Sequence, residues 1–377
     1  MTTTLAELTT FRVGGPIASL IDVEGPEALA KAVHDADQAG TPLLVLGGGS
    51  NLLASDAGFH GVVVRDRSQS YKVHEAEQYT PNDDQQLTPS GSHDSVLLTA
   101  TAGTVWDDLV AFTVREGLSG LEFLSGIPGS VGAAPVQNVG AYGSEVAHTL
   151  VSVRAWDRLE ARDVEFTAAD LDFSYRHSIL KDSVVNGSGG RHWGPTGRWV
   201  VLSVTFRLER SPLSAPVRYA EVARRLGVDV GERISAETAR STVLELRTSK
   251  GMVLDEADHD TWSAGSFFTN PIISPQQAAT LPEDAPRFPA GEGMVKTSAA
   301  WLIDHAGFPK GWAVPAQQGN PSQPRASLST KHVLALTNRG GASAADIETL
   351  ARAIRDGVQR AFGVTLVPEP VALGITW

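Results

Sequence analysis

The sequence contains no cysteine among its 377 residues. This absence excludes a disulfide scaffold, a thiolate zinc site, a cysteine nucleophile and attachment of a flavin through cysteine. Residues 1–12 also lack the basic start and apolar run of a signal peptide. The charge-free run at 123–144 is broken by Gly, Pro, Gln and Asn, so it cannot span a bilayer as an apolar helix. We therefore expect a cytoplasmic chain without membrane insertion.

Basic residues are in the minority, with 31 against 43 acidic residues and a net charge of −12. This balance argues against a nucleic-acid-binding protein, which normally shows a basic surface, but it permits a local basic pocket. The apolar content of 42% excludes global disorder. At about 100–200 residues per domain, the length predicts two or three domains.

Hydrophobic patterning predicts an alternation of helices and strands. In the first third, βα alternation indicates an α/β unit with some parallel pairing. We expect helices over 27–38, 104–115, 233–250, 297–306 and after Ser343, and strands over 42–46, 61–65, 96–101, 150–158, 199–208 and 333–337.

One polar stretch, two helix caps and one apolar stripe support further predictions. The stretch 70–95 is polar with almost no apolar residues, so we interpret it as a mobile surface insertion without function. Capping boxes are predicted where Thr104 precedes Asp107 and where Ser343 precedes Asp346. The last helix carries an apolar stripe that we expect in the core, at Ile347, Leu350, Ile354 and Val358.

Two glycine-rich segments are candidate ligand-binding loops. Gly-Gly-Gly-Ser-Asn at 47–51 follows a predicted strand, but it is neither a Walker A loop nor a Rossmann fingerprint, and a tight turn explains it equally well. The second segment, at 126–143, contains five glycines and two prolines and no charged residue. Two such loops favour a dinucleotide cofactor held by main-chain contacts over two unrelated turns.

Isolated charged and polar groups are candidates for the remaining chemistry. Arg-Thr-Ser-Lys at 247–250 ends a predicted helix, where the cations could complement the helix dipole or clamp an anion. Ser266 lies in a probable turn without triad partners, which disfavours an acyl-transfer nucleophile and leaves proton donation open. Arg176 and Glu369 are a cation and a carboxylate in charge-poor surroundings, and surface solvation also explains them. The scattered histidines disfavour a metal site.

Taken together, these segments resemble the UDP-N-acetylenolpyruvoylglucosamine reductases (MurB family). The resemblance runs from Thr-Phe-Arg-Val-Gly-Gly at 10–15 to Pro-Glu-Pro at 368–370, and omits only the polar insertion. It is most specific in the combination of the glycine block at 126–143, Ser-Tyr-Arg at 174–176 and the segment 265–271. Tyr219 resembles the mobile tyrosine loop of one subgroup of the family.

The resemblance implies an α+β chain: an FAD-binding fold of the vanillyl-alcohol-oxidase type in two subdomains, plus a C-terminal α/β substrate-binding domain. The implied segments are FAD-binding subdomains at 1–69 and 96–215, the insertion at 70–95, the substrate-binding domain at 216–355 and a return to the FAD-binding region at 356–377. FAD is held non-covalently in the family. The family-like FAD contacts are Gly47, Gly48, Gly49, Ser50, Asn51, Leu52, Ser125, Gly126, Ile127, Pro128, Gly129, Val131, Gly132, Gln137, Asn138 and Gly140.

The implied reaction is reduction of UDP-N-acetylglucosamine enolpyruvate to UDP-N-acetylmuramate by NADPH through FAD. It belongs to peptidoglycan precursor synthesis, and so to cell-wall biogenesis, cell shape and cell division. Arg176 and Glu369 match the positions that stabilise the enol-like intermediate, as a fixed cation and a carboxyl group that shares a proton. Ser266 matches the donor that protonates the carbanion, which requires a dry, oriented site.

Substrate contacts are also implied by the resemblance. Lys250 resembles the residue that meets the UDP diphosphate, and Asn270 lies in the uridine-binding stretch; Tyr175 and Tyr219 complete the implied set. The segment 329–332 departs from the glutamine-bearing version of some members, so contacts from its lysine and histidine are not implied. The acidic surface is compatible with a monomer.

Two other functions stay open at this stage. An oxidase of the same flavin superfamily would share the fold, but it has no use for a UDP clamp at Lys250 and Tyr219 or a proton donor at Ser266. A sugar-nucleotide-binding module without catalysis would not require Arg176 and Glu369 together with that serine. Failure to bind any flavin would favour the binding module.

Overall fold

The computed structural model describes residues 3–75, 94–315 and 324–377. Its internal contacts divide the chain into two compact units. Unit 1 comprises residues 1–17, 49–60 and 248–377, and unit 2 comprises residues 18–48 and 61–247. Each unit is therefore built from segments that are distant in the sequence.

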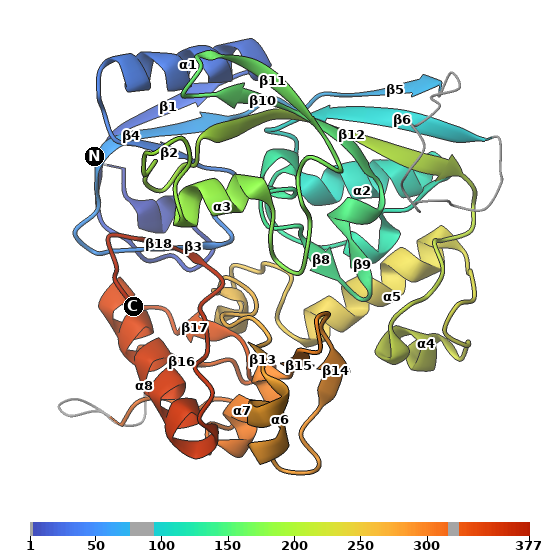
Figure 1. The fold of residues 1–377 in the computed structure, drawn as a ribbon, viewed down its shortest axis with the longest axis vertical. Coiled ribbons are helices and arrows are strands. Elements are labelled where there is room, and N and C mark those ends of the chain that lie inside the picture. Colours follow the sequence, from blue (N-terminus) through green and yellow to red (C-terminus); the bar gives the residue numbers. More distant parts are fainter. Residues whose placement is uncertain (1–2, 76–93, 316–323) are drawn as a thin grey trace. The chain divides into compact units, whose positions relative to one another are not determined.

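Unit 2 is organised around an antiparallel sheet with the strand order β11-β10-β12-β6-β5, and β7 also pairs with β12. In Figure 1, helix α1 lies above these strands and helix α2 lies below them. The elements are β5 (Tyr71–Glu75), β6 (Ser95–Thr101), β7 (Leu118–Ser119), β10 (Leu150–Asp157), β11 (Arg162–Thr167), β12 (Trp199–Arg210), α1 (Pro26–Gln38) and α2 (Trp106–Arg115).

A second, three-stranded sheet has the order β1-β4-β2, with β1 (Ile17–Val23), β2 (Leu43–Val45) and β4 (Phe59–Asp66). β2 and β4 run parallel, which confirms the predicted parallel pairing in the first third of the chain. A continuous apolar core joins these layers, with Leu29 and Val33 of α1 and Leu109 of α2 almost fully buried. The alternation of apolar residues along β6 fits a strand with one face in this core.

The helix that begins near Thr104 is present, but its predicted capping box is wrong. α2 begins at Trp106, and its N-cap is Val105. The Thr104 hydroxyl lies 3.2 Å from the Ser70 carbonyl, to which it donates. The Asp107 carboxylate instead accepts hydrogen bonds from Gly126 and Arg240, so tertiary contacts replace the local cap.

The interpretation of 70–95 as a mobile insertion is wrong at its two ends. Residues 71–75 form β5, which pairs with β6, and β6 itself begins at Ser95. The Tyr71 ring packs against Phe112 of α2 at 4.4 Å between centroids, which gives this polar strand an apolar anchor. The rest of the predicted insertion, 76–93, lies outside the described residues.

Short elements complete unit 2 and extend from the main sheet. They are α3 (Ile179–Val185), α4 (Ala220–Leu226), α5 (Ala236–Ser249), β8 (Gly140–Ala141) and β9 (Ser144–Glu145), with 3₁₀ turns at Glu122–Leu124, Val131–Ala133 and Val146–His148. α5 confirms the helix predicted over 233–250.

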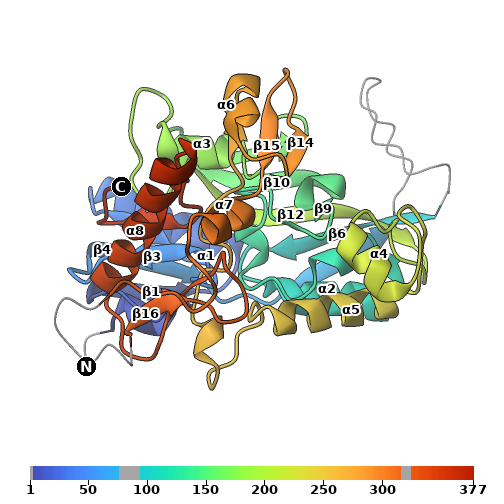
Figure 2. The same ribbon diagram turned by 90° about the horizontal axis from the view of Figure 1, so that it is seen from below.

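Unit 1 contains small sheets covered by helices, and Figure 2 shows α7 and α8 among them. The strand orders are β13-β15-β14, β16-β17 and β18-β3, and the last of these pairs is parallel. The elements are β3 (Leu52–Ala54), β13 (Ile272–Ile273), β14 (Arg287–Pro289), β15 (Val295–Thr297), β16 (Ala326–Leu328), β17 (Leu336–Asn338), β18 (Val371–Leu373), α6 (Pro275–Thr280), α7 (Ala299–His305) and α8 (Ala344–Phe362), with 3₁₀ turns at Leu5–Leu8 and His259–Thr261.

α8 confirms both the predicted cap and the predicted stripe. The Ser343 hydroxyl accepts from the Asp346 amide and the Asp346 carboxylate accepts from the Ser343 amide, so the capping box is present. All four stripe residues are buried, with exposed fractions of 0–1%. Residues 333–335 are a turn rather than strand, since the Ala335 amide donates to the His332 carbonyl, and β17 begins only at Leu336.

None of the helices within the described residues is long and apolar enough to cross a membrane. The division into two units does not test the predicted domain boundaries at 69, 95, 215 and 355, so these boundaries stay a prediction.

Candidate functional site

In unit 2 the two glycine-rich segments lie against each other. A Cβ atom added to Gly48 would lie 2.7 Å from the Cα of Gly129, and one added to Gly47 would lie 2.6 Å from the Ser130 hydroxyl oxygen. A side chain on Gly48 would push the two backbones apart, and one on Gly47 would collide with the Ser130 side chain. Gly47 and Gly48 are exposed, so their main chain is available to a ligand. This cradle fits the main-chain contact with FAD that the sequence predicts.

The main-chain N–H and C=O groups of Gly126 are each bonded to a charged side chain. Its N–H donates to Asp107 Oδ1 at 2.6 Å, and its carbonyl accepts from Arg247 Nε at 3.0 Å. Arg240 forms a bidentate ion pair with Asp107 at 2.7 and 2.8 Å. Gly126 has φ +69°, and a Cβ there would lie 2.8 Å from Leu244, so a glycine is required.

Burial and hydrogen bonding act in opposite directions on the charged residues of this clamp. Burial alone would raise the pKa of Asp107, but hydrogen bonds from Arg240 and Gly126 outweigh it and hold the pKa below its usual value. Burial lowers the pKa of Arg247, while Tyr142 and Asp107 favour its charged form. The sequence predicted only an anion clamp or a dipole partner for Arg247, and it missed the contact with Gly126.

The segment around Arg176 lies beside the second glycine segment in unit 2. Arg176 Nη2 donates to the Gly140 carbonyl at 3.1 Å, and its guanidinium lies 5.3 Å from the centroid of the Tyr175 ring. Arg176 has φ +56°, a left-handed conformation that is uncommon for a residue with a side chain. A non-glycine residue in this region is held there by its surroundings.

Asn138 is buried, with an exposed fraction of 1%. Its Nδ2 donates to Glu145 Oε2 at 2.7 Å and to the Ser174 carbonyl at 3.2 Å, and its Oδ1 accepts from the Ala147 amide at 3.0 Å. This side chain therefore joins three segments of unit 2. Its predicted contact with FAD is not tested by these bonds and stays a prediction.

In unit 1 the segments of Ser266 and Glu369 are neighbours. Phe268 and Pro368 form an antiparallel bridge, and the Glu369 amide donates to the Phe267 carbonyl at 2.8 Å. The end of the first glycine loop lies there too, because the Val371 amide donates to the Asn51 carbonyl at 2.9 Å. The structure thus places two of the three predicted catalytic residues on adjacent segments of one unit.

The other predicted cofactor residues have varied surroundings. A Cβ on Gly49 would lie 1.9 Å from the Leu8 carbonyl oxygen, which excludes any side chain there. The Ser125 hydroxyl is buried and donates to the Glu122 carbonyl at 2.6 Å. Leu52 and Val131 are buried, Pro128 is exposed, and half-buried positions are Ser50, Ile127, Gly132 and Gln137.

The predicted substrate residues fall in both units. In unit 1, Lys250 is half-buried, and Asn270 Oδ1 accepts from the Ala299 amide at 3.0 Å, next to the N-cap of α7. In unit 2, Tyr219 is 43% exposed and its ring meets Tyr142 edge-on at 5.7 Å. Lys331, for which no substrate contact is implied, forms an ion pair with Asp258 at 2.5 Å.

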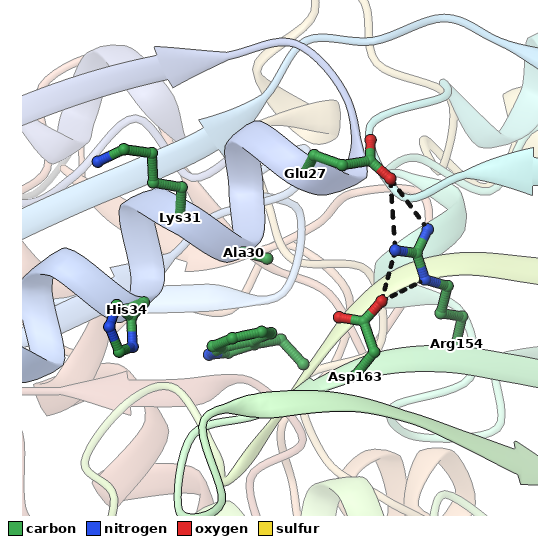
Figure 3. Close-up of a pocket in the computed structure, with 7 residues that line it drawn as sticks. Glu27, Ala30, Lys31, His34, Arg154 and Asp163 are labelled. Atoms are coloured by element: carbon green, nitrogen blue, oxygen red, sulfur yellow. Dashed lines mark hydrogen bonds and ion pairs between the residues drawn. The ribbon is translucent and has the colours of Figure 1, made fainter.

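A separate groove of about 330 Å³ lies on unit 2 between α1 and the hairpin of β10 and β11 (Figure 3). Arg154 forms ion pairs there with Glu27 at 3.3 Å and with Asp163 at 2.5 Å. The lining residues include none of the predicted site residues. The groove is therefore not part of the predicted site.

Sequence reasoning missed the side chains that support the site. Asp107 was assigned to a local cap, and two cations were missed: Arg240, which pairs with Asp107, and Lys181, whose ammonium donates to the Arg176 carbonyl at 3.2 Å. The one available signal is that Lys181 lies in the first turn of a helix, where a cation opposes the helix dipole. Over the described residues, no group of three or more His, Asp or Glu side chains could hold a metal ion.

Comparisons with known proteins agree with the predicted family. The model of the UDP-N-acetylenolpyruvoylglucosamine reductase C-terminal domain matches residues 256–373, and the model of an FAD binding domain matches residues 17–159. The chain is 49% identical over 372 residues to UDP-N-acetylenolpyruvoylglucosamine reductase of Cutibacterium acnes, covering 99% of this chain and 89% of that protein. It is 47% identical over 382 residues to the protein of that name from Streptomyces coelicolor, covering 98% and 89%.

A solved structure extends this similarity to the fold. The crystal structure of UDP-N-acetylenolpyruvylglucosamine reductase from Thermus caldophilus matches with a TM-score of 0.62 at 26% identity, covering 99% of this chain and 98% of that chain. The predicted α+β fold with an FAD-binding part and a C-terminal domain is thus confirmed. With close to half of its residues identical to these relatives over nearly its whole length, the chain belongs to the UDP-N-acetylenolpyruvoylglucosamine reductase family of FAD-dependent oxidoreductases.

Proposed function

We propose that this chain uses NADPH to reduce UDP-N-acetylglucosamine enolpyruvate to UDP-N-acetylmuramate, a step of peptidoglycan precursor synthesis. Family membership supports the reaction class. The proposal includes FAD held without a covalent bond, a monomeric enzyme and a cytoplasmic location. The residues that fit FAD are Gly48 and Gly129, whose close backbone approach leaves no room for a side chain on Gly48, and Gly47, which faces the Ser130 hydroxyl.

The observation that carries the proposal is the pairing of the Ser266 and Glu369 segments. The bond from the Glu369 amide to the Phe267 carbonyl joins the two segments that carry Ser266 and Glu369, which supports the proposal. Phe267 and Phe268 are buried to 0% and 2% exposure, so these segments are anchored in the core of unit 1. A preorganised arrangement of this kind is what proton donation by a weakly acidic hydroxyl requires.

The opposed glycine segments would hold FAD, and the chemistry supplied by the bound cofactor would be hydride donation to the terminal carbon of the enolpyruvyl group. In our proposal, the Arg176 guanidinium and the Glu369 carboxyl group stabilise the negative charge that develops on the substrate carboxylate and the neighbouring carbon. The Ser266 hydroxyl then gives its proton to that carbon, which completes the addition of hydride and proton across the double bond. Lys250 binds the diphosphate of the substrate, and Asn270 binds its uridine end. Tyr175 and Tyr219 contact further parts of the substrate.

The Ser266→Ala variant tests the assigned proton donor. We expect flavin reduction by NADPH to be unchanged, because no proton from Ser266 is used in that step. Reoxidation by the enolpyruvyl sugar nucleotide should slow by about 10²–10⁴-fold. The two half-reactions are measured separately, under anaerobic conditions, by stopped-flow absorbance of the flavin.

Two further variants sharpen this test. Ser266→Cys retains an acidic hydrogen and should recover part of the reoxidation rate. Ser241→Ala removes an exposed hydroxyl on α5 and should behave as wild type. An equal loss in both half-reactions of Ser266→Ala would show that the proton-donor assignment is wrong.

A further inference from the structure

The loop 174–178 is joined to the second glycine segment by side-chain hydrogen bonds from both sides. Asn138 Nδ2 donates to the Ser174 carbonyl at 3.2 Å. From the other side, Arg176 Nη2 donates to the Gly140 carbonyl at 3.1 Å, and the Ser178 hydroxyl donates to the Val136 carbonyl at 2.5 Å. The loop is therefore held against the predicted cofactor segment at three points along its length.

The backbone of Arg176 needs this support. Its φ of +56° lies in the left-handed region, which disfavours a residue with a Cβ. Such conformations persist where surrounding contacts over-determine them, and they cluster at active sites. The orientation of the guanidinium therefore depends on contacts that hold the Arg176 peptide.

Lys181 provides one of those contacts. Its ammonium donates to the Arg176 carbonyl oxygen at 3.2 Å and to Gln137 Oε1 at 3.4 Å. One cation thus links the strained residue to the Gln137 side chain of the glycine segment. The side chain is half-buried, which strengthens these charge-assisted bonds relative to bulk water.

The place of Lys181 in its helix indicates that this contact has a purpose beyond helix stability. α3 begins at Ile179 after the N-cap Ser178, whose hydroxyl accepts from the Lys181 amide at 3.3 Å. Lys181 is therefore in the first turn, where the helix dipole favours an anion and opposes a cation. Local helix energetics do not explain a lysine here, whereas the bond to the Arg176 carbonyl does.

We propose that Lys181 is a positioning residue for the reduction: it holds the Arg176 carbonyl against the glycine segment and thereby fixes the guanidinium of Arg176. The inference rests on the proposed function, in which that guanidinium stabilises the enol-like intermediate. In this proposal Lys181 acts through Arg176 rather than on the reacting atoms. Its loss slows the step that uses Arg176 more than it slows flavin reduction by NADPH.

The test compares Lys181→Met, Lys181→Gln and Lys181→Arg in the FAD-loaded protein. For the first two variants, we expect the limiting rate of reoxidation by the enolpyruvyl sugar nucleotide to fall about tenfold or more, which corresponds to the loss of one charge-assisted bond. The substrate concentration at half-saturation should change less than that rate, because the guanidinium acts on the developing charge. Lys181→Arg keeps a cation and should restore most of the rate.

Controls separate this role from a general loss of structure. Lys31→Met removes an exposed lysine paired with Asp35 on α1 and should match wild type in both half-reactions. The flavin content and the midpoint of thermal unfolding are recorded for every variant. If Lys181→Met does not fold, Lys181→Gln takes its place in the comparison. Equal slowing of both half-reactions, an unchanged reoxidation rate, or a Lys181→Arg variant as slow as Lys181→Met would overturn the proposal. If wild-type protein is not reoxidised by the sugar nucleotide, the proposed function itself fails and the role of Lys181 falls with it.

Discussion

Replacing Asp107 by alanine removes the acceptor for both the Gly126 amide and the Arg240 guanidinium. The amide bond is 2.6 Å and the guanidinium bonds are 2.7 and 2.8 Å. Gly126 is buried, so its N–H has no ready access to water after the change. The variant therefore tests whether the clamp on Gly126 supports both the fold of unit 2 and the binding of FAD.

The expected loss of stability follows from these contacts. A hydrogen bond to a charged group contributes about 1.5–3 kcal/mol, and a partly exposed ion pair adds about 1 kcal/mol or less. The side chains of Asp107 and Arg240 are 32% and 17% exposed. The energy of this ion pair therefore lies between that of a surface pair and that of a buried pair. We expect the free energy of unfolding to fall by about 2–4 kcal/mol.

The expected loss of FAD affinity follows from the release of Gly126 in the second glycine segment. Ordering the backbone of one released residue costs about 1–2 kcal/mol, so FAD affinity should weaken by about tenfold. Urea denaturation of the FAD-free protein gives the first quantity, and fluorescence titration with FAD gives the second. Asp108→Ala is a matched control, because Asp108 is an exposed carboxylate in the same first turn of α2.

The pH dependence supplies an independent check. Since hydrogen bonds outweigh burial and hold the pKa of Asp107 below its usual value, its contribution is fully present above the unfolded-state pKa. That contribution is lost as the pH falls through the lower folded-state pKa, so wild type and variant should begin to converge once the pH is below about 4. The reasoning is refuted if Asp107→Ala behaves like Asp108→Ala in unfolding and in FAD titration.

Two further predictions follow from buried side chains. Ile354→Ala removes a fully buried residue from the α8 stripe and should lower the free energy of unfolding by about 2–5 kcal/mol in urea denaturation. Thr349→Ala, at an exposed position of the same helix, is the control and should stay within about 0.5 kcal/mol of wild type; equal losses in the two variants would contradict the prediction. Burial outweighs the opposing charge of Arg247 and raises the pKa of Tyr142 to about 12. In an ultraviolet titration, the Tyr142→Phe variant should therefore lack one tyrosine that ionises near pH 12 in wild type. Loss of a tyrosine that ionises near its ordinary value of about 10 would show that this ring is not the shifted group.

The elements that follow local rules could be predicted from the sequence. The Ser343 cap and the apolar stripe of α8 depend on spacings of three and four residues, and both are present. The Thr104 cap failed because Asp107 has better partners in Gly126 and Arg240, which lie far from it in the sequence. Local patterns do not contain such tertiary competition.

The candidate site could be predicted in part. The glycine segments, Arg176, Ser266 and Glu369 were found through their combination along the chain, and the structure pairs the segments of the last two. The supporting contact of Lys181 was not predictable, because it joins the Arg176 carbonyl in a loop where Arg176 has a positive φ, and sequence patterns for residues with side chains do not indicate that conformation. Polar residues 71–75 form a strand because β6 offers a free edge, which composition alone does not reveal.

The most direct test of the central claim is an anaerobic absorption experiment on the purified FAD-loaded protein. The proposed function predicts flavin bands that bleach on addition of NADPH and return when UDP-N-acetylglucosamine enolpyruvate is added without oxygen. Bands that bleach but return only with oxygen would contradict the reductase proposal and favour an oxidase. A protein that binds no FAD under reconstitution would contradict the catalytic account as a whole.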